Sequence, residues 1–186
     1  MKKALLAISL GLILIPLVFA GCGKNVATAP QPSTGNSPAT TTTSDNSSFN
    51  FILKYGVTAK NEIDTYQDKF TKDMISDPPI TINLRLTNEE MERIYQKMIE
   101  IDFFSYPERF MVNVPPGEPT TIVTPFPIYQ FTVEKDSQIK KLDWDDRIMN
   151  PDVKADRLRE LINLIIDIIE SKEDYKALPE PSGGYM

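Results

Sequence analysis

The sequence predicts an α+β domain, with an antiparallel sheet packed by two helices. Apolar and polar residues alternate in several short segments, which is the period of a half-buried strand. In two other segments apolar residues recur every three or four positions, the period of a helix packed on one side. The predicted strands are neighbours along the chain, and such neighbours pair antiparallel. The 186 residues, 41% of them apolar, allow one core, which we place at residues 49–178.

The first four strands are predicted between residues 49 and 86. The alternation begins at Phe49 and runs to Tyr55. Residues 62–66 and 69–75 predict a hairpin, and the prolines after Asp77 are expected to break the chain. The strictest alternation follows at residues 80–86, which predict another strand.

A helix is expected to begin at Thr87. Thr87 and Glu90 have the spacing of a capping box, in which each side chain accepts from the other residue's backbone N–H. The apolar positions that follow have helical spacing and predict one buried face. They are Met91, Ile94, Tyr95, Met98 and Ile101.

Two irregular segments follow this helix. The first is an aromatic cluster, which either closes the core under the helix or lines a pocket: Phe103, Phe104, Tyr106 and Phe110. The second is a proline-rich stretch from Pro115 to Pro127, expected to be a long exposed loop. It either simply connects two elements or offers a stiff extended backbone to a partner.

The last predicted elements are a hairpin and a helix. Residues 128–134 and 138–144 predict strands joined by a short turn. Asn150 is the expected N-cap of the final helix, with Pro151 at its first position. Residues 179–186 are expected to be a flexible tail. The apolar stripe of the helix comprises Leu158, Leu161, Ile162, Ile165, Ile168 and Ile169.

The start of the chain has the pattern of a secretory signal. Lys2 and Lys3 precede an uncharged apolar run that ends at Phe19. A membrane-spanning helix needs about 20 apolar residues, and this run is shorter and interrupted by Gly11 and Pro16. We therefore expect residues 1–21 to be a cleaved signal peptide.

The residues at the end of this signal, Val18-Phe19-Ala20-Gly21-Cys22, resemble the lipobox of bacterial membrane-anchored lipoproteins. In that family small residues precede an acylated cysteine, although Phe19 stands where an aliphatic residue is usual. The resemblance implies that Cys22 carries the lipid and holds the protein at the extracytoplasmic face of the cell membrane. The alternative is a conventional signal peptide with an incidental cysteine. No other part of the sequence resembles a family of known activity.

Cys22 is the single cysteine, so the chain forms no internal disulfide. A lone thiol is unusual in an exported protein unless it has another use, and lipid attachment provides one. A diacylglyceryl group has two acyl chains and is sufficient for stable anchoring.

Residues 22–48 are expected to be the lipidated cysteine and a disordered tether. The segment is rich in Thr, Ser, Pro, Asn and Gly and shows no hydrophobic periodicity, so it cannot bury enough apolar area to fold. A coil of this length spans about 25–30 Å. The domain would therefore stand clear of the lipid headgroups.

The charge balance is acidic. The whole chain has a net charge of −6, and removal of Lys2 and Lys3 with the signal makes it −8. Such a surface lacks the basic stripe that nucleic acid requires. The expected partners are the membrane, through the lipid on Cys22, and an envelope protein.

The sequence has little of the common catalytic equipment. It has no histidine, and Cys22 is assigned to lipid, which excludes histidine-dependent triads and histidine-ligated zinc. Asp143, Asp145 and Asp146 offer oxygen ligands of the kind that calcium uses, or they are simply solvated. We assign no catalytic residue, cofactor or metal site.

Three functions remain open. The first, which the missing catalytic residues favour, is a noncatalytic accessory or binding module held at the cell surface by lipid. The second is an extracytoplasmic hydrolase that uses two carboxylates, which an acidic cleft in the structure would favour. The third is a lipid-tethered inhibitor or chaperone-like partner protein, which an exposed apolar patch would favour.

Overall fold

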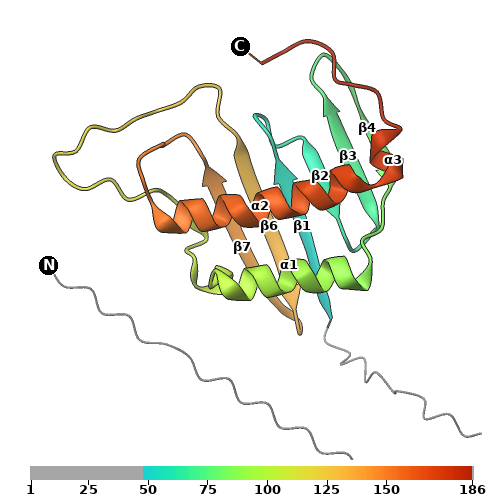
Figure 1. The fold of residues 1–186 in the computed structure, drawn as a ribbon, viewed down its shortest axis with the longest axis horizontal. Coiled ribbons are helices and arrows are strands. Elements are labelled where there is room, and N and C mark those ends of the chain that lie inside the picture. Colours follow the sequence, from blue (N-terminus) through green and yellow to red (C-terminus); the bar gives the residue numbers. More distant parts are fainter. Residues whose placement is uncertain (1–47, 186) are drawn as a thin grey trace, which may run out of the picture. The chain divides into compact units, whose positions relative to one another are not determined.

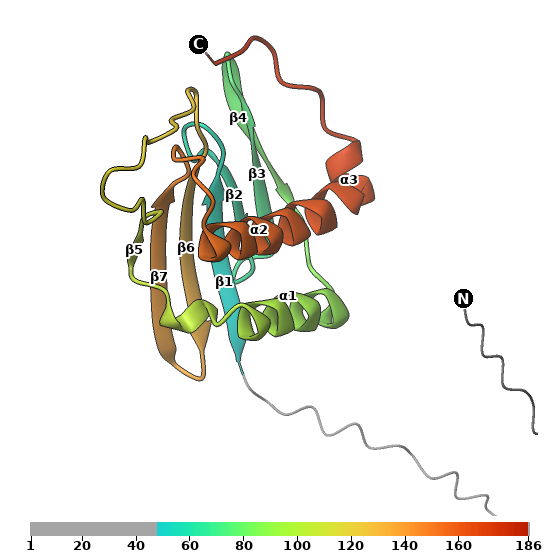
Figure 2. The same cartoon turned by 60° about the vertical axis from the view of Figure 1, so that its left-hand side comes forward.

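The computed structural model describes residues 48–185. Seven strands form one sheet in the order β4-β3-β2-β1-β6-β7-β5, and two long helices cross one of its faces (Figures 1 and 2). The α+β prediction is confirmed, except that β5 runs parallel to β7. The elements are β1 (Phe49–Tyr55), β2 (Asn61–Asp64), β3 (Lys69–Met74), β4 (Asp77–Asn83), α1 (Asn88–Glu100), a 3-10 turn (Phe103–Ser105), β5 (Arg109–Phe110), β6 (Ile128–Lys135), β7 (Gln138–Asp145), α2 (Val153–Ser171) and α3 (Glu173–Lys176).

The predicted signal peptide, Cys22 and the tether up to residue 47 lie outside the described residues. Within residues 48–185, no helix is both long enough and apolar enough to span a bilayer.

The core lies between the helices and one face of the sheet. β1 is the central strand, and its Leu53 pairs with Ile63 of β2 on one side and Phe131 of β6 on the other. These three side chains are buried, as the two-residue alternation predicts. Both predicted hairpins are present, β2 with β3 and β6 with β7.

The start of α1 and the aromatic cluster follow the sequence expectations. The Thr87 hydroxyl accepts from the Glu90 N–H at 3.2 Å, and the Glu90 carboxylate accepts from the Thr87 N–H at 2.7 Å. Phe103 and Tyr106 are buried under the helices, so the cluster closes the core. Phe104 is the exception, since it is 36% exposed, and the buried Phe110 also lines the cavity described below.

The expected break at Asp77-Pro78-Pro79 is wrong, because β4 begins at Asp77. β4 is an edge strand, and an edge tolerates proline because half of its N–H groups need no partner in the sheet. The strand ends at Asn83, earlier than the alternation suggests. Leu84 and Leu86 still enter the core from the connection to α1.

The start of α2 also differs from the prediction. Its N-cap is Asp152, not Asn150, and the Asp152 carboxylate accepts from the N–H groups of Lys154 at 2.8 Å and Ala155 at 3.0 Å. Asp152 takes this role because Asn150 bonds elsewhere, as described below. The predicted apolar stripe of the helix is confirmed, with all six of its residues buried.

The segment expected to be a flexible tail lies against β3. The Pro179 carbonyl accepts from the Lys72 ammonium at 3.0 Å, and Ser182 forms a parallel bridge with Ile75. The Tyr185 hydroxyl donates to the Asp73 carboxylate. Lys72 and Asp73 are both buried, and buried charges require partners, which the tail supplies.

Candidate functional site

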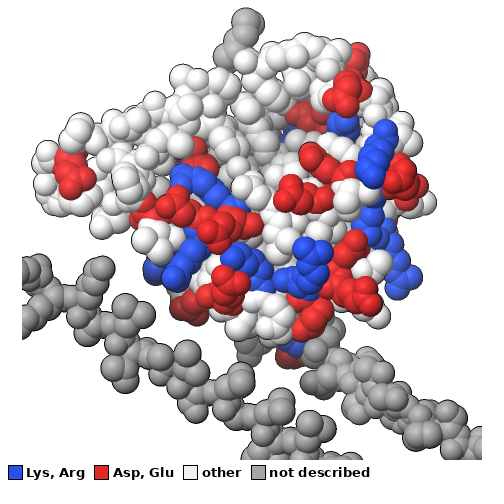
Figure 3. Space-filling view, viewed as in Figure 1, with Lys and Arg blue, Asp and Glu red and all other residues white. Residues whose placement is uncertain are grey.

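The most prominent feature outside the core is the connection from β5 to β6, residues 111–127, which we call the arm. It projects beyond the sheet at the end where β6 begins (Figures 1 and 2). Glu118 is its only charged residue. In the space-filling view the projection is uncharged apart from one acidic side chain at its far end (Figure 3).

The tip of the arm is a tight turn. The Glu118 N–H donates to the Pro115 carbonyl at 3.1 Å, and Gly117 has a φ of 89°. Proline at the second position and a glycine with positive φ at the third are the signature of a type II turn. The interpretation of this stretch as a stiff extended backbone is therefore wrong at residues 115–118.

The returning half of the arm is pinned to residues 147–150. Ile122 and Ile148 form an antiparallel bridge, flanked by two backbone hydrogen bonds of 2.9 Å. The Asn150 amide completes the attachment, since its oxygen accepts from the Thr121 N–H at 2.9 Å and its nitrogen donates to the Pro119 carbonyl at 3.0 Å. Asn150 therefore fixes the arm instead of capping α2.

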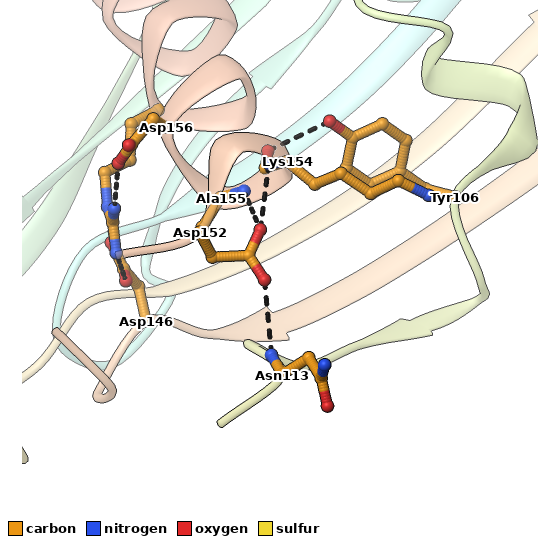
Figure 4. A network of polar contacts seen from close by, with 8 residues as sticks. Tyr106, Asn113, Asp146, Asp152, Lys154, Ala155 and Asp156 are labelled. Atoms are coloured by element: carbon orange, nitrogen blue, oxygen red, sulfur yellow. Dashed lines mark hydrogen bonds and ion pairs between the residues drawn. The ribbon is translucent and has the colours of Figure 1, made fainter. Parts of the chain in front are cut away.

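The outgoing half of the arm is fixed to the start of α2 (Figure 4). The Asp152 carboxylate that caps the helix also accepts from the Asn113 N–H at 3.2 Å. Nearby, the Tyr106 hydroxyl donates to the Lys154 carbonyl at 2.9 Å. The arm is thus exposed, as predicted, but held at several points along its length.

Apolar side chains are exposed on the arm and on the segment that holds it. Met111 is 69% exposed and Ile122 is 63% exposed. Val123, Met149 and Val153 are also exposed, and we call these five residues the exposed apolar residues. We call the arm, together with residues 147–153, the arm end.

A cavity of about 380 Å³ lies at the base of the arm. Arg109 pairs with Asp143 across β5 and β7, and Gln130 of β6 is the neighbour of Asp143 on its other side. The cavity thus contains both acidic and basic groups and is not an acidic cleft. Its lining includes Arg109, Met111, Ile128, Gln130, Asp143, Asp145, Arg147 and Ile148.

The three aspartates considered as calcium ligands do not gather. Asp143 and Asp145 line the cavity, but Asp146 does not and is only 6% exposed. Its carboxylate binds Arg159 of α2, with an Nη2–Oδ1 distance of 2.6 Å (Figure 4). In the part of the chain that the structure describes, no three Asp, Glu, His or Cys residues form a group that could hold a metal.

Arg159 also lies beside Trp144. The guanidinium lies 5.2 Å from the centre of the Trp144 ring, which is buried. The hydrogen bonds to Asp146 raise the pKa of Arg159. Burial, followed by the nearby charge of Asp146, raises the pKa of Tyr129 to about 12. This cluster is structural and joins α2 to the sheet.

Sequence reasoning missed the attachment of the arm. The two short segments that pair, 121–123 and 147–149, show no alternation that predicts a strand. One signal was available, because Asn150 and Asp152 are both typical N-cap residues and a single helix uses only one. No family model, curated protein or solved structure matches this chain.

Proposed function

We propose that this chain is a lipoprotein held by a lipid on Cys22 at the extracytoplasmic face of the cell membrane. Its domain is a noncatalytic binding module for an envelope protein, and the arm end is the binding surface. The observation that carries the proposal is the set of exposed apolar side chains on the arm end, which hydrogen bonds hold in place. Exposed apolar side chains also favour an inhibitor or chaperone-like partner protein, which is a binding module of a more specific kind.

Exposed side chains of this size favour a partner. Burying apolar surface contributes roughly 25 cal/mol per Å², and Met111, Ile122 and Val153 are each more than 60% exposed. Ile122, Val123 and Met149 lie in the paired segments 121–123 and 147–149, and exposed apolar residues that gather in this way mark interaction sites more often than single ones do. The hydrogen bonds of Asn150 and Asp152 order the arm in advance, so binding costs less conformational entropy.

The position of the arm end also suits this role. β1 begins at Phe49 at one end of the sheet, and the arm projects at the other end (Figures 1 and 2). The chain that leads to Cys22 therefore joins the domain at the end away from the arm. A tethered domain can in this way present the arm to a second protein.

A carboxylate-dependent hydrolase is the second candidate, because Asp143 and Asp145 line one cavity. Residues two apart on a strand point to the same face, about 6.5–7 Å apart along the chain. Such an enzyme keeps one of its two acids protonated by its environment. Both aspartates are instead exposed, and Arg109 and Arg147 line the same cavity. The geometry therefore supports binding better than hydrolysis.

Hydroxyl-radical footprinting of the full chain tests the proposal. The oxidation of Met111 and Met149 is compared between the native envelope and the purified protein. We expect both to react several-fold more slowly in the envelope, while Tyr66 and Phe104, which are exposed elsewhere, react equally in both. Equal rates for the two methionines would show that the arm end is unoccupied and would contradict a binding role.

A further inference from the structure

We infer that the arm end binds a protein surface that combines an apolar hollow with a basic side chain opposite Glu118. The inference rests on the proposed function and adds the chemistry of the partner. The occupants to be distinguished from it are a lipid bilayer and a second copy of the chain.

Glu118 is placed where a partner must meet it. It lies in the turn at the tip of the arm, which is held by the Pro115–Glu118 hydrogen bond. The residue is exposed, and within residues 48–185 it has no ion pair. Glu118 is four residues from Ile122 along the chain, so a partner surface of ordinary interface size that covers Ile122 also meets this carboxylate, at least at its rim. A basic group on the partner is the way to compensate that charge.

A bilayer does not offer this compensation. Hydrocarbon has no counter-ion for Glu118, and a charged side chain there is strongly disfavoured. The arm is also irregular backbone, with N–H and C=O groups that hydrocarbon leaves without partners. Anionic headgroups repel the acidic side chain as well. The exposed aliphatic groups alone are compatible with lipid, but the backbone and Glu118 that accompany them are not.

A protein surface meets both requirements. It can donate and accept hydrogen bonds along the arm between its contacts with Met111, Ile122 and Met149. Opposite charge at the rim speeds encounter and fixes the orientation of the two proteins, and it is weakened by salt. The Pro115–Glu118 hydrogen bond closes the turn that presents Glu118, and the hydrogen bonds of Asn150 to Pro119 and Thr121 hold the residues that follow it.

The experiment places a photoactivatable benzoylphenylalanine at Ile122 in the full chain, in its native envelope. The adduct is measured for the otherwise unchanged chain, for Glu118→Lys and for Glu92→Lys. Glu92 is exposed on α1, and its side chain accepts only from Gln96 among the described residues, so it gives the same change of charge at another site. Thermal melts of both variants establish that they remain folded.

We expect a protease-sensitive adduct that falls about tenfold with Glu118→Lys and with high salt, and is unchanged with Glu92→Lys. An equal yield for the two variants overturns the inference, as does the absence of any protein adduct. An adduct between two differently tagged copies overturns it in favour of self-association.

The bilayer is tested with residues 22–186 carrying Cys22→Ser, which lack both the predicted signal and the lipid, and with vesicles of phosphatidylcholine and phosphatidylglycerol. Cosedimentation that is lost with Met111→Ser overturns the inference in favour of a membrane contact. The footprinting experiment distinguishes failure of this inference from failure of the proposed function. Protection of Met111 without any effect of Glu118→Lys leaves the proposed function standing and removes only the basic partner.

Discussion

Arg159 holds Asp146 through two parallel hydrogen bonds, with Nη2–Oδ1 at 2.6 Å and Nε–Oδ2 at 2.9 Å. Arg159 belongs to α2, and Asp146 directly follows β7, so the pair ties the long helix to the sheet beside the arm. Such bidentate pairs are stronger than ordinary hydrogen bonds because both partners are charged.

Asp146→Asn should destabilise the domain by about 2 kcal/mol, because the partly buried guanidinium of Arg159 loses its charged acceptor. Asp145→Asn, one residue away and exposed, should change the free energy of unfolding by less than about 0.5 kcal/mol. Urea denaturation of the full chain measures both. Similar losses for the two variants would mean that the pair has no special role.

A chelator should leave the melting temperature of the purified chain unchanged. The reason is that Asp146 is engaged by Arg159, which leaves Asp143 and Asp145 too few ligands for the six to eight oxygens of calcium. Removing a structural ion would lower the melting temperature by mass action. A decrease of several degrees that Asp145→Asn abolishes would establish a metal site.

The capping box of α1 should make stability depend on pH. Burial alone raises the pKa of Glu90, but hydrogen bonds from Lys172 and Thr87 outweigh burial and hold this pKa below its usual value. A lowered carboxyl pKa contributes stability that is complete above the unfolded pKa of about 4.3 and disappears as the pH falls through the folded value. Glu90→Gln should therefore cost about 1 kcal/mol near neutral pH.

The difference between Glu90→Gln and the unchanged chain should narrow as the pH falls below the unfolded pKa of about 4.3 and then through the lowered folded pKa of Glu90. Urea denaturation across this range measures it. A difference that stays constant with pH would assign the loss to packing and not to charge.

Tyr185→Phe should lower the free energy of unfolding by about 1 kcal/mol, since the buried Asp73 carboxylate loses a donor. Tyr66→Phe is the matched control, because its hydroxyl donates to Glu134 at an exposed site. The control should have a smaller effect. If both substitutions lower the free energy of unfolding by the same small amount, the attachment of residues 179–185 contributes little to stability.

Cys22→Ser should abolish incorporation of a fatty-acid probe into the chain expressed in a bacterial host, because only a thiol forms the thioether to the lipid. The precursor should also remain uncleaved, which a mass measurement detects. Unchanged labelling would show that Cys22 is not the attachment site. A chain cleaved normally but never labelled would favour a conventional signal peptide.

The local periodicity of the sequence predicts most of the helices and strands. It does not predict which segments far apart in the sequence pair with each other. The alternation at Phe49–Tyr55 and the helical stripe of α2 each reflect one neighbouring surface, so they are visible along the sequence. The parallel pairing of Arg109 with Asp143 is two residues long and joins positions 34 residues apart. A pairing of two residues is too short to produce a detectable hydrophobic period in the sequence.

The candidate site was predictable only in part. The proline-rich composition indicated an exposed loop between β5 and β6, and the structure confirms it. Which of Asn150 and Asp152 caps α2 depends on the arm. The Asn150 amide can both donate to Pro119 and accept from Thr121, whereas a carboxylate can only accept. Asn150 therefore binds the arm, and Asp152 caps the helix. Such a choice depends on which chain segment lies opposite.

The central position of β1 has a mechanical consequence. β1 is bonded to β2 on one side and β6 on the other, and it starts at Phe49, at the end of the sheet away from the arm. A pull between Phe49 and a partner at the arm therefore runs along the strand, across hydrogen bonds that lie perpendicular to it. All of those bonds share the load at once, and none is peeled open ahead of the others. A domain tethered through Phe49 and bound at the arm, as proposed, would therefore be loaded along a strand that is paired on both sides.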